Sequence, residues 1–86
     1  MYYVYLLYSR ELNEFYLGYT SDLKERLRSH QSGENKAIKK AHDWILAYYE
    51  AYLNEHTARK REANLKRSGK AQQSLKQRVR DSLEII

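Results

Sequence analysis

The chain has 86 residues with a formal net charge of +5, and this length accommodates one domain, over residues 1–86, with a small core. The absence of cysteine excludes a disulfide framework and a thiolate zinc site, and three scattered histidines make a poor zinc cage. No signal-peptide leader is evident and no stretch approaches the ~20 apolar residues of a membrane span, so we expect a cytoplasmic enzyme or binding module with no membrane partner.

The first predicted element is a β-hairpin. Residues 2–8 are rich in aromatic and branched side chains, a composition typical of a strand. Glu14–Thr20 has the same character and is predicted to pair with them across a turn at residues 9–13.

A helix is predicted next, over about residues 22–32. Ser21 or Asp22 can cap it, and Glu25 stands three residues after Asp22 as in a capping box. Gly33 supplies the stop signal.

A third strand is predicted after a charged, loop-like stretch over residues 34–43. The near-continuous apolar run Trp44–Leu53 indicates a strand covered on both faces, which we expect to be the central one, with a helix as the alternative. Tyr48, Tyr49 and Tyr52 are expected to fill the core or a sheet face.

Two helices complete the chain. One is predicted from Asn54 to about Arg67 and the other from about Ala71 to Leu83, with an interruption at Ser68-Gly69. These elements predict an α/β fold, a three-stranded, mainly antiparallel sheet flanked by helices.

The excess of positive charge is concentrated in the last two helices. Residues 59–80 hold nine Lys or Arg and one acid, Glu62. Such a stripe is typical of a nucleic-acid-binding surface, although a solvated helix surface has a similar pattern.

Two polar side chains are predicted to face inward from the first helix. Each helical residue advances by ~100°, so His30 lies ~20° and Arg26 ~60° from Leu23, which marks the buried face with Leu27. An inward histidine is more often structural than catalytic, and an inward arginine often only pairs with a carboxylate.

A carboxylate is predicted on the buried face of the second helix. Glu62 lies within ~40° of Ala58, which shares this face with Leu65. Because burying an ion costs several kcal/mol, Glu62 is expected either to pair with Arg26 or His30 or to bind a metal.

The order of these residues resembles that of the GIY-YIG nuclease superfamily, in particular its small stand-alone members. Tyr3-Val4-Tyr5 matches the first motif, with Tyr3 in place of glycine, and Tyr16-Leu17-Gly18 matches the second. The family's helix arginine and histidine fall on Arg26 and His30, and its metal-binding glutamate falls on Glu62.

The resemblance implies a metal-dependent DNA endonuclease with the fold described above. Tyr5 or Tyr16 would relay a proton from the attacking water, and Arg26 would stabilise negative charge on the phosphoryl oxygens. His30 would orient a tyrosine or share the relay, and Glu62 would hold Mg²⁺ or Mn²⁺.

The substrate is expected to be DNA, with RNA not excluded. Nothing resembles a recognition helix, so we expect low base specificity and action on branched, damaged or single-stranded DNA in repair or recombination. A catalytically silent nucleic-acid-binding or interaction module with the same fold is the alternative. The predicted DNA contacts are Tyr19, Thr20, Lys66, Arg67 and Lys70.

Overall fold

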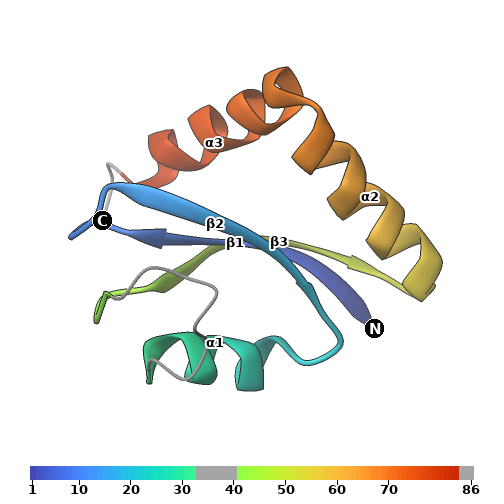
Figure 1. Ribbon diagram of the computed structural model, residues 1–86, viewed down its shortest axis with the longest axis horizontal. Coiled ribbons are helices and arrows are strands. Elements are labelled where there is room, and N and C mark those ends of the chain that lie inside the picture. The colour runs from blue at the N-terminus through green and yellow to red at the C-terminus, as the bar shows by residue number, and fades with distance from the viewer. Residues whose placement is uncertain (33–40, 84–86) are drawn as a thin grey trace.

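A three-stranded antiparallel sheet with helices on both faces forms the fold (Figure 1). The computed structural model describes residues 1–32 and 41–83. In chain order the elements are β1 (Tyr2–Ser9), β2 (Glu14–Thr20), α1 (Leu23–Gln31), β3 (Ile45–Tyr52), α2 (Glu55–Arg67) and α3 (Gly69–Leu83). The predicted fold class is confirmed.

The central strand is β1, because the strand order is β2-β1-β3. Every position of β1 from Val4 to Ser9 is buried, whereas β3 is an edge strand on which Ile45 and Tyr49 are exposed. The prediction that Trp44–Leu53 is the central strand, covered on both faces, is therefore wrong. The prediction counts the tyrosines of this run as apolar residues that need cover on both faces. A tyrosine can instead pack part of its ring and keep its hydroxyl in water, as it does on an edge strand.

Alternating side chains of β1 build two cores, one on each face of the sheet. Val4, Leu6 and Tyr8 pack with residues of α2 and α3, including Ala58 and Leu65. On the other face a second core packs against α1 and consists of Tyr5, Leu7, Ala41 and Trp44, with Leu23 and Leu27 of the helix against it. Figure 1 shows this arrangement, with α1 below the sheet and the other two helices above it.

The first helix begins where the sequence predicts. The Asp22 carboxylate accepts a hydrogen bond from the Glu25 backbone N–H at 3.1 Å, which satisfies one of the free donors at the helix start. The helix ends at Gln31 with Ser32 as its C-cap. The predicted stop at Gly33 and most of the predicted loop, up to residue 40, lie outside the described residues.

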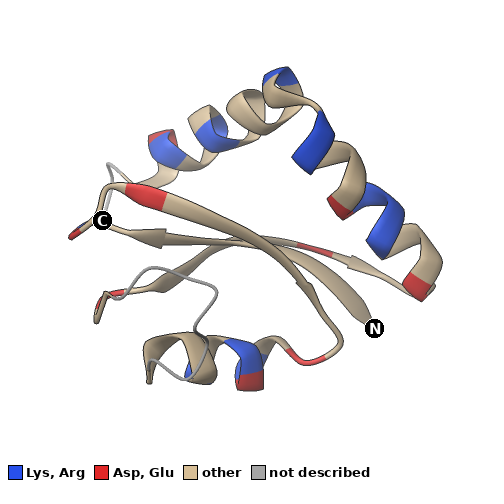
Figure 2. Ribbon diagram, in the orientation of Figure 1, with Lys and Arg blue, Asp and Glu red and all other residues tan. Residues whose placement is uncertain are grey.

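The last two helices follow one another almost directly. Asn54 caps α2 by accepting from the backbone N–H groups of His56 and Thr57. At the junction, Ser68 Oγ accepts from the Ala71 N–H, so α3 starts at Gly69, two residues earlier than predicted. Lys and Arg residues are spread along both helices (Figure 2). No helix within residues 1–32 and 41–83 is long and apolar enough to cross a membrane.

Candidate active site

A buried hydrogen bond between Tyr5 and His30 lies at the centre of the candidate site. The Tyr5 hydroxyl and His30 Nε2 are 3.2 Å apart, and each residue is only 1% exposed. The Tyr16 ring lies beside them, with its centroid 4.9 Å from that of His30 and 6.4 Å from that of Tyr5. Three separate elements, β1, β2 and α1, thus bring together three of the residues predicted to be catalytic.

The amphipathic pattern of α1 explains why His30 reaches this position. Leu23 and Leu27 pack against the core that contains Tyr5, and His30 continues the same face one turn later. The inward position predicted for His30 is confirmed.

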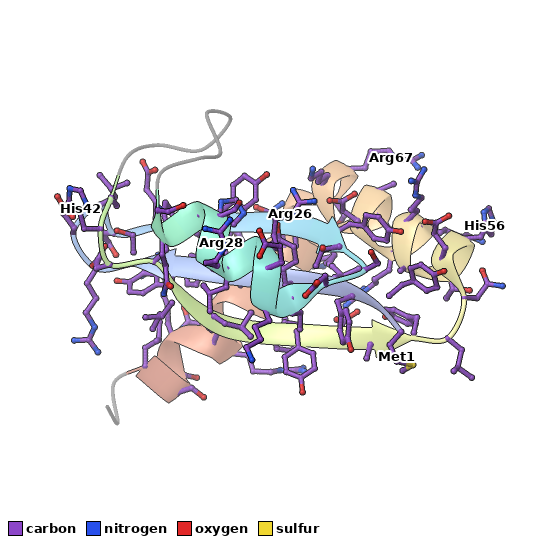
Figure 3. All side chains as sticks on the ribbon, turned by 90° about the horizontal axis from the view of Figure 1, so that it is seen from below. Met1, Arg26, Arg28, His42, His56 and Arg67 are labelled. Atoms are coloured by element: carbon purple, nitrogen blue, oxygen red, sulfur yellow. The ribbon has the colours of Figure 1, made fainter. Side chains whose placement is uncertain are left out.

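Arg26 is placed differently from its prediction, because its side chain is exposed. An arginine ~60° from the centre of the buried face can lay its stem along the helix and keep its guanidinium in water. Figure 3 looks onto this face of the molecule, with α1 in front of the sheet and Arg26 labelled on it. Its positive charge still acts on the site, since it lowers the pKa of both Tyr5 and His30.

Burial controls the protonation of the central pair. Burial, followed by the neighbouring Tyr16, raises the pKa of Tyr5 well above its ordinary value; Arg26 opposes this effect and Glu62 adds to it. Burial and the positive charge of Arg26 lower the pKa of His30. A neutral phenol therefore faces a neutral imidazole at pH 7. Among the described residues, His30 Nδ1 has no hydrogen-bond partner.

Gly18 gives Tyr5 the room that it occupies. The two residues are paired in register on β2 and β1. A Cβ added at Gly18 would lie 2.5 Å from Cζ of Tyr5, a distance that real Cβ atoms do not show. A glycine at this position therefore lets the Tyr5 ring lie directly against the backbone of β2.

Glu62 lies at the edge of the site with a side chain that is 22% exposed. It pairs with Lys66 at 3.4 Å, one turn along α2, and the described residues show no ion pair between it and Arg26 or His30. The predicted structural pairing with those two residues is therefore wrong, because Lys66 is the nearer cation. The carboxylate is close enough to the site for its charge to raise the pKa of Tyr5.

A divalent metal would find one protein ligand here. The described residues contain no group of three His, Cys, Asp or Glu side chains that could hold an ion. One half-buried carboxylate fits Mg²⁺ or Mn²⁺, hard cations that keep several waters and are completed by substrate phosphate. It does not fit zinc, which takes three or four protein ligands.

The predicted DNA contacts differ in what their side chains already do. The Tyr19 hydroxyl donates to Glu55 at 2.6 Å, and the Arg59 guanidinium lies over its ring. Thr20 is buried, and its hydroxyl bonds the Asp22 backbone, so its position gives no support for a phosphate contact. Lys66, Arg67 and Lys70 are exposed around the junction of α2 and α3.

Sequence reasoning missed the location of one aromatic residue. Tyr49 was expected only to fill space, but it is exposed and is the register partner of Tyr5 on the neighbouring strand. Side chains alternate between the two faces along β3, so Tyr49 must lie on the face opposite to Tyr48 and Tyr52, which pack against the core. This alternation could have separated Tyr49 from the other two tyrosines.

Comparison with known proteins agrees with this geometry. Residues 1–80 match the family model described as the GIY-YIG catalytic domain. The chain belongs to the GIY-YIG family. Its sheet and three helices are consistent with the fold of this family.

Relatives with this domain include two bacterial proteins named "UPF0213 protein". The one from Limosilactobacillus reuteri (strain DSM 20016) is 37% identical over 60 residues, which are 66% of this chain and 62% of that protein. The one from Streptococcus pneumoniae serotype 4 is 34% identical over 71 residues, 81% of this chain and 71% of that protein. The chain thus spans less than two thirds of the Limosilactobacillus relative.

A solved structure is also similar. The solution NMR structure of the UPF0213 protein from Bacillus halodurans has a TM-score of 0.54 and 28% sequence identity. The similarity covers 87% of this chain and 82% of that one.

Proposed function

We propose that this GIY-YIG protein is a metal-dependent endonuclease that hydrolyses DNA phosphodiester bonds, with residues 1–86 acting as one catalytic domain. The observation that carries the proposal is the buried Tyr5–His30 hydrogen bond, beside Tyr16, with the charges of Arg26 and Glu62 acting on the same phenol. Membership of the GIY-YIG family supports it, and nucleases of this family generally use divalent metals.

The tyrosines would relay the proton that the attacking water loses. Tyr5 has a neutral imidazole behind it, and Tyr16 is the more exposed of the two. We assign Tyr16 as the group that contacts the attacking water and the Tyr5–His30 pair as the next group in the relay. Water would give its proton to the Tyr16 oxygen, and Tyr16 would pass its own proton toward that pair.

Two side chains would help to compensate the negative charge of the phosphate. Arg26, exposed on α1, would donate to the phosphoryl oxygens through its planar fork. Glu62 would hold a divalent ion, which when bound polarises the phosphate and the leaving oxygen. Because Glu62 already pairs with Lys66 and offers a single carboxylate, metal affinity without DNA should be weak.

Residues 1–32 and 41–83 form no separate element for reading base edges, so low base specificity is proposed. Branched, damaged and single-stranded DNA are the candidate substrates, in repair or recombination. One incubation of the protein with nicked, branched and single-stranded DNA, and with RNA, in the presence and absence of Mn²⁺ would test the activity. Binding by the folded protein without cleavage of any of these would instead favour a catalytically silent binding module.

The metal assignment is tested by Glu62→Gln. This variant should lose cleavage and keep DNA binding within a few-fold, because it removes a metal ligand and leaves the basic stripe in place. Asp81→Asn is the control, since Asp81 is an exposed carboxylate of α3, and it should retain cleavage. Circular dichroism establishes that both variants fold. Full activity in folded Glu62→Gln would refute the assignment.

A further inference from the structure

An exposed tyrosine borders the candidate site on the α1 side of the sheet. Tyr49 is 53% exposed, whereas most large aromatic side chains of a small domain are packed. Its ring makes a T-shaped contact with Tyr3, with centroids 5.9 Å apart and planes at 68°. This contact fixes the orientation of a large, rigid aromatic surface that remains open to solvent.

The register of the sheet places this surface next to the buried pair. Tyr49 on β3 is the Cα partner of Tyr5 on β1, so the two side chains stand on the same face of adjacent strands. Figure 1 shows that α1 lies under only one half of the sheet and leaves the half near the start of β1 and the end of β3 uncovered by a helix. Tyr49 therefore lies beside Tyr5 on this face, at the border of the candidate site.

The dimensions suit a nucleic-acid strand. Adjacent strands lie ~4.8 Å apart, so β3 and β2, which flank β1, are ~10 Å apart, and successive nucleotides of a stacked strand rise by ~3.4 Å. A base resting on Tyr49 of β3 would thus be about three nucleotides from a phosphate held near Tyr16 of β2. The exposed guanidinium of Arg26 and the net charge of +5 complement that phosphate chain.

The chemistry of an open aromatic ring selects for unpaired bases. Inside a duplex each base face is covered by its neighbours, whereas in a single strand it is free to stack on a protein ring. We propose that Tyr49, oriented by Tyr3, is a base-stacking platform that directs single-stranded nucleic acid into the site. This inference rests on the proposed function and names its substrate class.

Binding without catalysis tests the platform. Anisotropy of a labelled single-stranded oligonucleotide and of the blunt duplex of the same sequence would be measured with the full chain in the presence of a chelator. Tyr49→Ala should weaken single-strand binding by about 5- to 100-fold, the range for loss of one stacked base, and should change duplex binding little. Tyr49→Phe and Tyr49→Trp keep a ring and should keep the single-strand affinity.

Leu53→Ala is the matched control, because Leu53 is 88% exposed and apolar but lies just beyond β3. It should leave both affinities unchanged. Abasic sites should be placed at each position of the single strand in turn. At one or two positions, removal of the base should weaken binding by the wild type but cause no further loss of affinity in Tyr49→Ala. That coupling would assign the lost contact to a base.

Three results would overturn the platform. The first is that Tyr49→Ala weakens the binding of single strand and duplex equally. The second is that Leu53→Ala weakens single-strand binding as much as Tyr49→Ala does. The third is that the wild type is a dimer and Tyr49→Ala a monomer, which would make this face a contact between two copies. The same titrations with single-stranded DNA and with RNA of the same sequence show which of the two nucleic acids Tyr49 binds. Because these titrations contain a chelator and measure only binding, their result does not depend on whether the protein cleaves DNA.

Discussion

The neutral state of the Tyr5–His30 pair limits what each group can do. A buried phenol with a raised pKa is a poor base by itself, so it can move a proton only if His30 takes one at the same time. The orphan Nδ1 of His30 is easier to accommodate as a lone pair than as an unsatisfied N–H. This favours the tautomer with its proton on Nε2 in the resting protein, so that proton would have to move to Nδ1 before Nε2 could accept one from Tyr5.

Arg26 should not tolerate replacement by lysine. Lysine keeps the positive charge but loses the planar fork that can hold two phosphoryl oxygens. Single-turnover cleavage by Arg26→Lys should fall by at least ~100-fold, the effect of one lost transition-state donor. Arg28→Lys is the control, because Arg28 is exposed on the same helix and pairs with Glu25 at 2.7 Å. Equal rates for wild type and Arg26→Lys would assign Arg26 to long-range electrostatics alone.

The site residues were predictable from the sequence to different degrees. His30 lies well within the angular range of the buried face, so spacing alone placed it correctly. Arg26 lies near the boundary of that face, where the length of its side chain decides its exposure, and angle could not settle this. The pairing of Glu62 with Lys66 was available from their spacing of four residues, but the search for a buried partner overlooked it.

At the scale of the elements, α2 and α3 provide the surface that could hold DNA. Residues 59–80 carry nine basic side chains, and Figure 2 shows Lys and Arg spread along both helices. Several of them also have structural contacts, since Lys76 and Arg80 lie over the Phe15 ring. The exposed group at the junction, Lys66, Arg67 and Lys70, is therefore the best place to test DNA binding.

DNA affinity should depend strongly on salt. Three to five basic residues on phosphates imply a log–log slope of about −2 to −4.5, because each neutralised phosphate releases counterions. Replacing Lys66, Arg67 and Lys70 together by glutamine should flatten this slope in anisotropy titrations with Glu62→Gln protein, which avoids cleavage. The triple Arg10→Gln, Lys24→Gln, Arg28→Gln removes the same charge outside the stripe and should alter the slope less. A slope that the change at Lys66, Arg67 and Lys70 leaves untouched would place the DNA contact elsewhere, and a slope near zero would mean that no phosphate is neutralised.

Most elements, but not their arrangement, followed from local sequence. Caps and alternation located both strands of the hairpin and the starts of α1 and α2 within a residue or two. The order of strands depends on which strand receives two partners, and composition does not encode this. β1 and β3 are both aromatic, and β1 is the central strand because it pairs with both β2 and β3.

At the scale of the whole molecule, one polar cluster joins the edge strand to the second helix. The Glu50 carboxylate on β3 accepts two hydrogen bonds from the Arg61 guanidinium of α2, at 2.8 and 2.9 Å. It also accepts from the hydroxyls of Tyr48 and Tyr52, each at 2.5 Å. These bonds attach β3, which has only one neighbour in the sheet, to the helical layer.

This cluster should make the fold sensitive to acid. Burial alone would raise the pKa of Glu50, but Arg61 and the two tyrosine hydroxyls outweigh it and lower that pKa to about 2. A carboxylate whose pKa is lower in the folded than in the unfolded chain stabilises the fold above its unfolded pKa, and this contribution is lost as the pH falls toward 2. The free energy of unfolding should therefore decline between about pH 5 and pH 2, by up to ~3 kcal/mol from this group.

Urea unfolding across that pH range, with two variants, assigns the decline to Glu50. Glu50→Gln should be less stable than wild type at pH 7, because Arg61 loses its partner, and it should show a flatter dependence on pH. The double variant Tyr48→Phe, Tyr52→Phe keeps the ion pair but removes two donors, so the folded-state pKa of Glu50 should rise, and the decline should be smaller and should be complete at a higher pH. If wild type and Glu50→Gln lost stability in parallel from pH 5 to pH 2, other carboxylates would account for the acid sensitivity and the cluster would serve only to position β3.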